Sequence, residues 1–87
     1  MSHDALQEAL EHLVTGITHH PDDIVINSFE RGRTQTLEVS VNPKDLGRVI
    51  GRGGRTVQAL RTVMNALAQS QRVRVDIIDT DREESNE

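Results

Sequence analysis

The sequence contains no cysteine and only one aromatic residue, Phe29, among its 87 residues. Without cysteine the chain can form no disulfide, no thiolate zinc site and no cysteine nucleophile. RNA-binding surfaces that stack bases on exposed rings use two or three aromatic side chains, so a platform of that kind is excluded. Long apolar runs are also missing, since no run approaches the roughly 20 residues that cross a bilayer, and the first residues lack a signal-peptide pattern. We therefore expect a cytoplasmic protein with no membrane association.

Positive charge is concentrated in one segment of a chain whose formal net charge is −4. Residues 1–43 and residues 75–87 each carry a net charge of −5, whereas residues 44–74 carry +6. The basic residues of this segment are Lys44, Arg48, Arg52, Arg55, Arg61, Arg72 and Arg74. Nonspecific polyanion binders are usually basic throughout, so this pattern indicates a local footprint for a few phosphates. The alternative is an ordinary solvated surface patch.

A glycine turn lies in the middle of the basic segment. Its sequence is Val49-Ile50-Gly51-Arg52-Gly53-Gly54-Arg55-Thr56-Val57. Glycine can adopt backbone angles that other residues avoid and lets a ligand approach the backbone closely. An apolar helix follows, and the start of a helix offers unpaired N–H groups and positive partial charge to an anion. With Arg52 and Arg55 beside it, this turn is typical of a phosphate-binding segment.

Apolar periodicity predicts the elements on either side of the turn. A first helix has its apolar stripe at Leu6, Leu10, Leu13, Val14 and Ile17, with Ser2 or Asp4 as the cap. A hairpin follows, with one strand over 24–29 and a second that alternates apolar and polar residues over 37–42. Asn42 and Pro43 predict the start of a short helix over 44–50. The helix after the turn has its core stripe at Val57, Leu60, Val63, Met64 and Leu67, and the last strand covers 72–78.

These elements predict an α+β domain of order αββααβ, with a three-stranded sheet packed on three helices. The domain spans residues 1–79: the first helix and hairpin occupy 4–42, the two helices and the glycine turn 43–69, and the last strand 72–78. Residues 80–87 are acidic and lack apolar periodicity, so we expect a disordered tail.

The glycine turn resembles the I-G-x-x-G-x-x-[IV] signature of KH (K-homology) domains, and the element order is that of the type II KH fold. Further segments are similar to small bacterial single-KH proteins of the KhpA type. They are His20-Pro21-Asp22-Asp23, residues 41–51 and residues 73–79, so the resemblance covers nearly the whole chain. It implies a single-stranded RNA-binding protein whose GxxG loop grips about four nucleotides. Such a protein acts as an RNA chaperone or post-transcriptional regulator.

The resemblance also assigns roles to individual residues. Gly51 and Gly54 are the loop glycines, with Arg52 and Gly53 as the variable pair between them. Three apolar residues, Val49, Ile50 and Val57, form the floor of a groove, although each could equally be ordinary core. Arg48 and Arg55 lie at its rim. A backbone clamp does not sense a 2′-hydroxyl, so single-stranded DNA stays open as a ligand.

No enzyme is expected. The glycine turn lacks the lysine and the spacing of a P-loop, and no βαβ unit surrounds it as a dinucleotide site requires. His3, His12, His19 and His20 are more typical of solvated surface than of a metal site, and we expect no cofactor. The alternative function is an adaptor that pairs with another KH protein and binds RNA only secondarily. Family resemblance implies a homodimer, or a heterodimer with a larger KH-containing relative.

Overall fold

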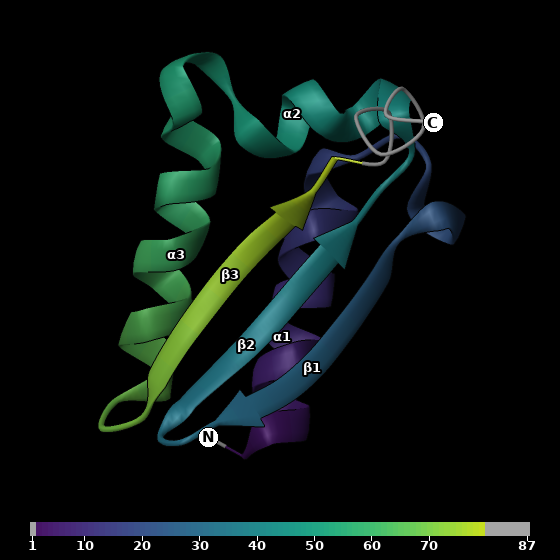
Figure 1. Cartoon of the computed structure of the whole chain (residues 1–87). Helices are drawn as coiled ribbons and strands as arrows, with labels where there is room; N and C mark the ends of the chain where they lie inside the picture. Colours follow the sequence, from purple (N-terminus) through teal and green to yellow (C-terminus); the bar gives the residue numbers. More distant parts are fainter. Residues whose placement is uncertain (1, 80–87) are drawn as a thin grey trace.

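Three strands form one sheet, with two long helices packed against it and a short helix across one end (Figure 1). The structure, a computed structural model, describes residues 2–79, so the acidic tail lies outside the described residues. The elements are α1 (His3–Ile17), β1 (Val25–Arg31), β2 (Thr34–Ser40), α2 (Leu46–Ile50), α3 (Arg55–Ala68) and β3 (Arg72–Ile78). The predicted α+β class and the order αββααβ are confirmed.

The sheet has the order β1-β2-β3, with β1 antiparallel and β3 parallel to β2. The hairpin turn between β1 and β2 contains Gly32 at a φ of 59°, a left-handed value that favours glycine. In the register, Ser28 lies opposite Leu37 and Leu37 opposite Val75, whereas Phe29 lies opposite Thr36 and Thr36 opposite Arg74. Successive residues of a strand point to opposite faces. The first row therefore faces the helices and the second row faces outward.

The core lies between the inner face of the sheet and the two long helices. Its fully buried apolar side chains come from both long helices, from α2 and from two strands: Leu6, Leu10, Val14, Leu37, Val39, Val49, Met64 and Val75. The predicted place of Val63 in the core stripe of α3 is wrong, because its side chain is 43% exposed. The buried face of α3 consists instead of Val57, Leu60, Met64 and Ala68. These four residues are three or four positions apart and so lie on one face of the helix, whereas Val63 lies at the side of that face.

Side-chain caps define where the helices begin. Ser2 is the N-cap of α1, since its Oγ accepts a hydrogen bond from the Ala5 N–H at 3.2 Å, which leaves Asp4 inside the helix. Asn42 Oδ1 accepts from the Lys44 N–H at 2.8 Å. The segment it caps begins as a 3₁₀ turn over Pro43–Asp45 and becomes α-helical only at Leu46. The predicted helix over 44–50 is thus two short helical pieces, which deliver the chain to Gly51.

Candidate nucleic-acid interface

The glycine turn joins α2 to α3 through a single 3₁₀ turn over Arg52–Gly54. Gly51, Gly53 and Gly54 all have positive φ, at 78°, 64° and 79°. The Gly51 N–H donates to the Gly47 carbonyl at 2.8 Å and so closes α2, and the Gly54 N–H donates to the Gly51 carbonyl at 3.1 Å. These backbone angles explain why glycine stands at each of the three positions.

The three glycines differ in what surrounds them. A Cβ at Gly51 would collide with the Thr56 side chain and would lie 2.7 Å from the Thr56 backbone nitrogen. Nothing lies within 4 Å of a Cβ built at Gly53 or Gly54. Gly51 is therefore required by the packing of the turn on the first residues of α3. The space over Gly53 and Gly54 is open to a ligand.

Helix α3 begins at the open side of this turn. Its N-cap is Gly54, which has no side chain and therefore makes no capping hydrogen bond to the first N–H groups of the helix. Those N–H groups and the helix dipole favour an anion, and the exposed side chains of Arg52 and Arg55 add two full positive charges. Of these groups, the Arg55 N–H already donates to the Arg52 carbonyl. The turn thus combines close backbone approach, the positive end of a helix and mobile cations at one point.

The three apolar residues predicted for a groove floor lie at different depths. Val49 is fully buried and belongs to the core. Val57 is 7% exposed, and Ile50 is 36% exposed. Of the three, only Ile50 presents a substantial apolar surface to solvent. Val49 can support the turn from beneath but offers no surface to a ligand.

The Arg48 side chain is directed toward the start of α2. Its Nη1 donates to the Lys44 carbonyl at 3.2 Å and lies 3.5 Å from Asp45 Oδ1. Both partners precede α2, whereas the glycine turn follows it. Arg48 is therefore not turned toward the loop in this structure, unlike the exposed Arg52 and Arg55.

Asp45 joins the start of α2 to the connection between α1 and β1. Its carboxylate is fully buried and accepts hydrogen bonds from the N–H groups of His19 and His20, at 3.1 and 2.9 Å. His20 Nδ1 lies 3.0 Å from the same carboxylate. Burial alone would raise the pKa of Asp45, but the hydrogen bonds from His19 and His20 outweigh it and hold this pKa below its usual value. This carboxylate fixes the position of the short helix that carries the chain into the glycine turn.

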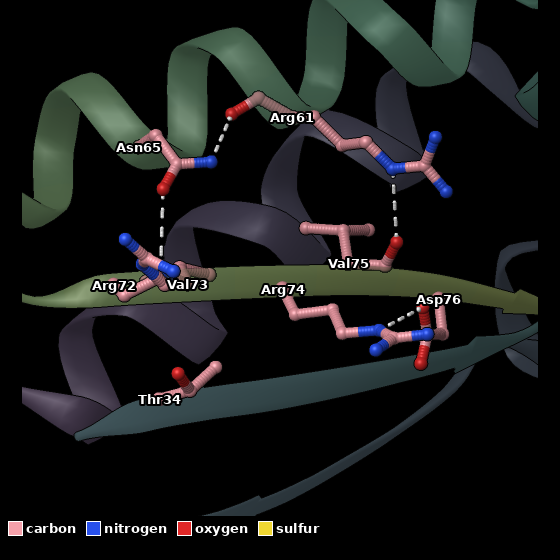
Figure 2. A pocket seen from close by; sticks show the side chains of 8 residues that line it. All are labelled: Thr34, Arg61, Asn65, Arg72, Val73, Arg74, Val75 and Asp76. Carbon is pink, nitrogen blue, oxygen red and sulfur yellow. Dashed lines mark hydrogen bonds and ion pairs between the residues drawn. The ribbon is translucent and has the colours of Figure 1, made fainter.

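A hollow of about 490 Å³ lies along the edge of β3 beside α3 (Figure 2). Side chains of α3 engage the β3 backbone there: Arg61 Nε donates to the Val75 carbonyl at 3.1 Å, and Asn65 Oδ1 accepts from the Val73 N–H at 3.3 Å. Figure 2 shows the two terminal nitrogens of Arg61 turned away from that carbonyl. Arg72 and Arg74 line the same hollow from the strand.

Sequence reasoning missed this hollow. It counted Arg61, Arg72 and Arg74 among the basic residues but gave them no place in the site. The available signal was the i, i+4 spacing of Arg61 and Asn65 on one helix face, together with the alternation of arginine and valine in β3. Only the fold shows that this face of α3 lies beside β3.

The described residues form neither a metal site nor a membrane span. Within residues 2–79, no group of three or more histidine, cysteine or acidic side chains is placed to hold a metal ion. The helices in the same part of the chain are too short or too polar to cross a membrane.

Comparison with known proteins identifies the family. Residues 7–78 match the KH-domain family described as KhpA/KhpB, KH domain. The chain belongs to this family. It is a non-enzymatic family, in agreement with the expectation that the chain is not an enzyme. No solved structure matches the chain.

Curated relatives of this KH domain are similar over most of their length. The protein named RNA-binding protein KhpA from Leifsonia xyli subsp. xyli is 57% identical over 74 residues, which cover 85% of this chain and 97% of the relative. A protein of the same name from Streptomyces coelicolor is 55% identical over 76 residues, covering 87% and 95% of the two chains. The one from Mycobacterium tuberculosis is 49% identical over 75 residues, covering 86% and 92%.

Proposed function

We propose that this KH domain binds single-stranded RNA and grips the backbone of about four nucleotides through the turn formed by Gly51, Arg52, Gly53 and Gly54. The observation that carries the proposal is the open space over Gly53 and Gly54 at the uncapped start of α3. The relatives named as RNA-binding proteins support it. In the cytoplasm, the domain acts as an RNA chaperone or post-transcriptional regulator.

A phosphate fits this turn for electrostatic reasons. The start of a helix carries a partial positive charge of about half an electron charge, and its free N–H groups point along the axis toward an incoming anion. Arg52 and Arg55 are exposed on the same turn, and arginine can donate two parallel hydrogen bonds to one phosphate. Residues without a side chain at positions 53 and 54 leave room for the backbone of the nucleic acid.

The bases of the gripped segment would lie beyond the loop. Ile50 offers an exposed aliphatic surface, and the hollow along β3 offers the donors of Arg61 and Arg72. Base edges carry hydrogen-bond acceptors that suit such donors. Arg48 is held at the other end of α2, so its contribution to this path is smaller than that of Arg52 and Arg55.

One domain that grips about four nucleotides has a small interface, which predicts weak binding. A second KH unit on the same RNA would raise the effective concentration of the first. We therefore include in the proposal a homodimer, or a heterodimer with a larger KH-containing relative, as the RNA-binding form. Sedimentation at high protein concentration tests the homodimer, and a monomeric mass throughout would exclude it.

Fluorescence anisotropy with short labelled single-stranded RNAs tests the clamp. The double variant Arg52→Asp/Gly53→Asp should bind at least ~10-fold more weakly, because two carboxylates replace a cation and open space. The matched control is Gly32→Asp/Arg33→Asp in the hairpin turn, which changes the same residue types and the same charge at the opposite end of the sheet (Figure 1).

The control should retain most of its affinity. Equal losses in the two variants would mean that only overall charge matters and would remove the assignment to the loop. No binding by the unaltered protein would favour the adaptor function instead. Circular dichroism of each variant shows whether it is folded before binding is compared.

A further inference from the structure

The outer face of the sheet carries the single aromatic residue of the chain. Phe29 lies on β1 with its side chain 41% exposed, and Val25 on the same strand is 51% exposed. Opposite Phe29 stand Thr36 on β2 and then Arg74 on β3. Among residues 2–79, no helix covers this face, since α1 lies behind the sheet and α3 beside β3 (Figure 1). A buried position for a lone phenylalanine would be the ordinary outcome, so its place on an open sheet face calls for a physical account.

Phe29 forms one wall of a shallow hollow of about 220 Å³. Thr36, at the centre of the row, is only 8% exposed and forms the floor. Arg74 stands on the far side, two strand spacings or roughly 10 Å from Phe29 across the sheet. Two carboxylates also line the hollow, those of Glu38 on β2 and Asp76 on β3, which lie opposite each other in the sheet. Arg31 of β1 also lines the hollow, which thus has one aromatic wall, two cations and two carboxylates.

This hollow adjoins the one along the edge of β3. Arg74 and Asp76 line both of them, and their side chains are joined by an ion pair of 3.0 Å from Arg74 Nε to Asp76 Oδ1. Figure 2 shows the two side chains on the side of β3 away from Val75 and its contact with α3. A nucleic acid that follows the edge of β3 can therefore cross this strand beside Arg74 and reach Phe29 without leaving the protein surface.

We propose that the outer sheet face is a second RNA contact, at which one unpaired base beyond the clamped nucleotides stacks on Phe29. A base suits the hollow because every base has a face that stacks on an aromatic ring, and Arg74 adds a guanidinium to the same hollow. The two carboxylates offset the charges of Arg31 and Arg74, so a phosphate gains little there, and they accept hydrogen bonds from exocyclic amino groups. The site therefore prefers adenine, cytosine or guanine to uracil. This inference rests on the proposed RNA clamp.

Binding of RNAs of two lengths tests the inference. An RNA of four nucleotides occupies only the clamp, whereas one of eight also reaches the sheet face. The variant Phe29→Leu keeps an apolar side chain but removes the ring, so it should bind the longer RNA about 5- to 20-fold more weakly and the shorter RNA unchanged. The matched control, Val25→Leu on the same strand, should leave both affinities unchanged.

A fluorescent base reports the stacking directly. RNA of eight nucleotides with one 2-aminopurine outside the clamped segment should show quenched fluorescence on the unaltered protein and not on Phe29→Leu. An eight-nucleotide RNA rich in uracil outside the clamp should bind more weakly than one rich in adenine.

Several outcomes would overturn the inference and leave the clamp intact. Equal binding of the longer RNA by Phe29→Leu and the unaltered protein is one, and equal weakening for both lengths is another. Altered self-association of Phe29→Leu in sedimentation, with RNA binding unchanged, would assign the face to a protein contact. Failure of the clamp itself gives a different result, in which Arg52→Asp/Gly53→Asp binds both RNAs as the unaltered protein does.

Discussion

At the scale of single residues, the three glycines of the turn have different tolerances for a side chain. Gly51 has a φ of 78° and a ψ of 168°, a region essentially restricted to glycine, and a Cβ there collides with Thr56. Gly53 and Gly54 have ψ values of 17° and 14°, in the left-handed region that asparagine tolerates, and open space around them. Gly51 is therefore required by both its backbone angles and its packing, whereas Gly53 and Gly54 are favoured by their backbone angles alone.

This difference predicts the stability of alanine variants. Gly51→Ala should lower the free energy of unfolding by roughly 3 kcal/mol or more, because strain and collision add. Gly53→Ala and Gly54→Ala should each lower it by only about 1 kcal/mol. Urea unfolding measures all three, with Gly53→Asn as the mildest control. Equal losses at positions 51 and 53 would contradict this account of the turn.

Asp45 predicts a pH dependence of stability. Its pKa in the folded protein is lowered below the ordinary value of 3.8, so its carboxylate stabilises the fold above that pH. This contribution is lost as pH falls through the folded pKa, because the protonated, uncharged group accepts the hydrogen bonds of the His19 and His20 N–H groups more weakly. The free energy of unfolding, measured with urea, should decline between pH 5 and pH 3, and a component of this decline should be absent in Asp45→Asn. Asp22→Asn, at an exposed position, should retain that component.

At the scale of elements, α3 and β3 are joined by side chains as well as by packing. Asn65 accepts from the Val73 N–H at 3.3 Å and donates to the Arg61 carbonyl at 2.9 Å. Asn65→Ala should therefore speed hydrogen exchange at the Val73 amide and cost about 1 kcal/mol of stability. Gln58→Ala, at an exposed position on the same helix, is the control. Unchanged exchange at Val73 would mean that this bond adds little to the contact of the two elements.

The elements themselves were largely predictable from the sequence. Asn42 and Pro43 marked the start of the short helix, and the alternation in residues 72–78 gave the limits of β3 as observed. The prediction of Val63 as core was wrong, since an apolar stripe shows that a helix has a buried face but not where its centre lies. The strands of the hairpin were placed one to three residues away from their observed ends, as is usual where pairing rather than side-chain pattern sets the limits.

The candidate site was predictable only in part. Local sequence contains the glycines and their arginines, which is why the turn could be identified. The burial of Asp45 depends on His19 and His20, about 25 residues earlier in the chain, and no pattern near Asp45 indicates it. The direction of Arg48 has nearer causes, the Lys44 carbonyl and the Asp45 carboxylate on the preceding turn. Interactions between distant segments are set by the packing of whole elements, so they emerge only from the fold.

At the scale of the whole molecule, the fold gathers the basic segment along one path. Arg52 and Arg55 lie at the start of α3, Arg61 on the same helix, and Arg72 and Arg74 on the neighbouring strand. The acidic residues of the N-terminal half include a cluster on α1 formed by Asp4, Glu8 and Glu11. A chain with a net charge of −4 therefore presents one basic path to an anionic partner.

The extent of this path predicts the salt dependence of RNA binding. A clamp on three or four phosphates gives a slope of log affinity against log salt of about −2 to −3, at roughly 0.7 per contact. Engagement of all seven basic residues of the segment 44–74 by phosphates would give a slope near ~−5. Anisotropy titrations from low to physiological salt distinguish the two, and Gly32→Asp/Arg33→Asp should keep the slope of the unaltered protein. A slope near ~−5 would replace the local clamp with a continuous electrostatic track. The shallower slope would mean that bases and backbone N–H groups, rather than charge alone, hold the RNA.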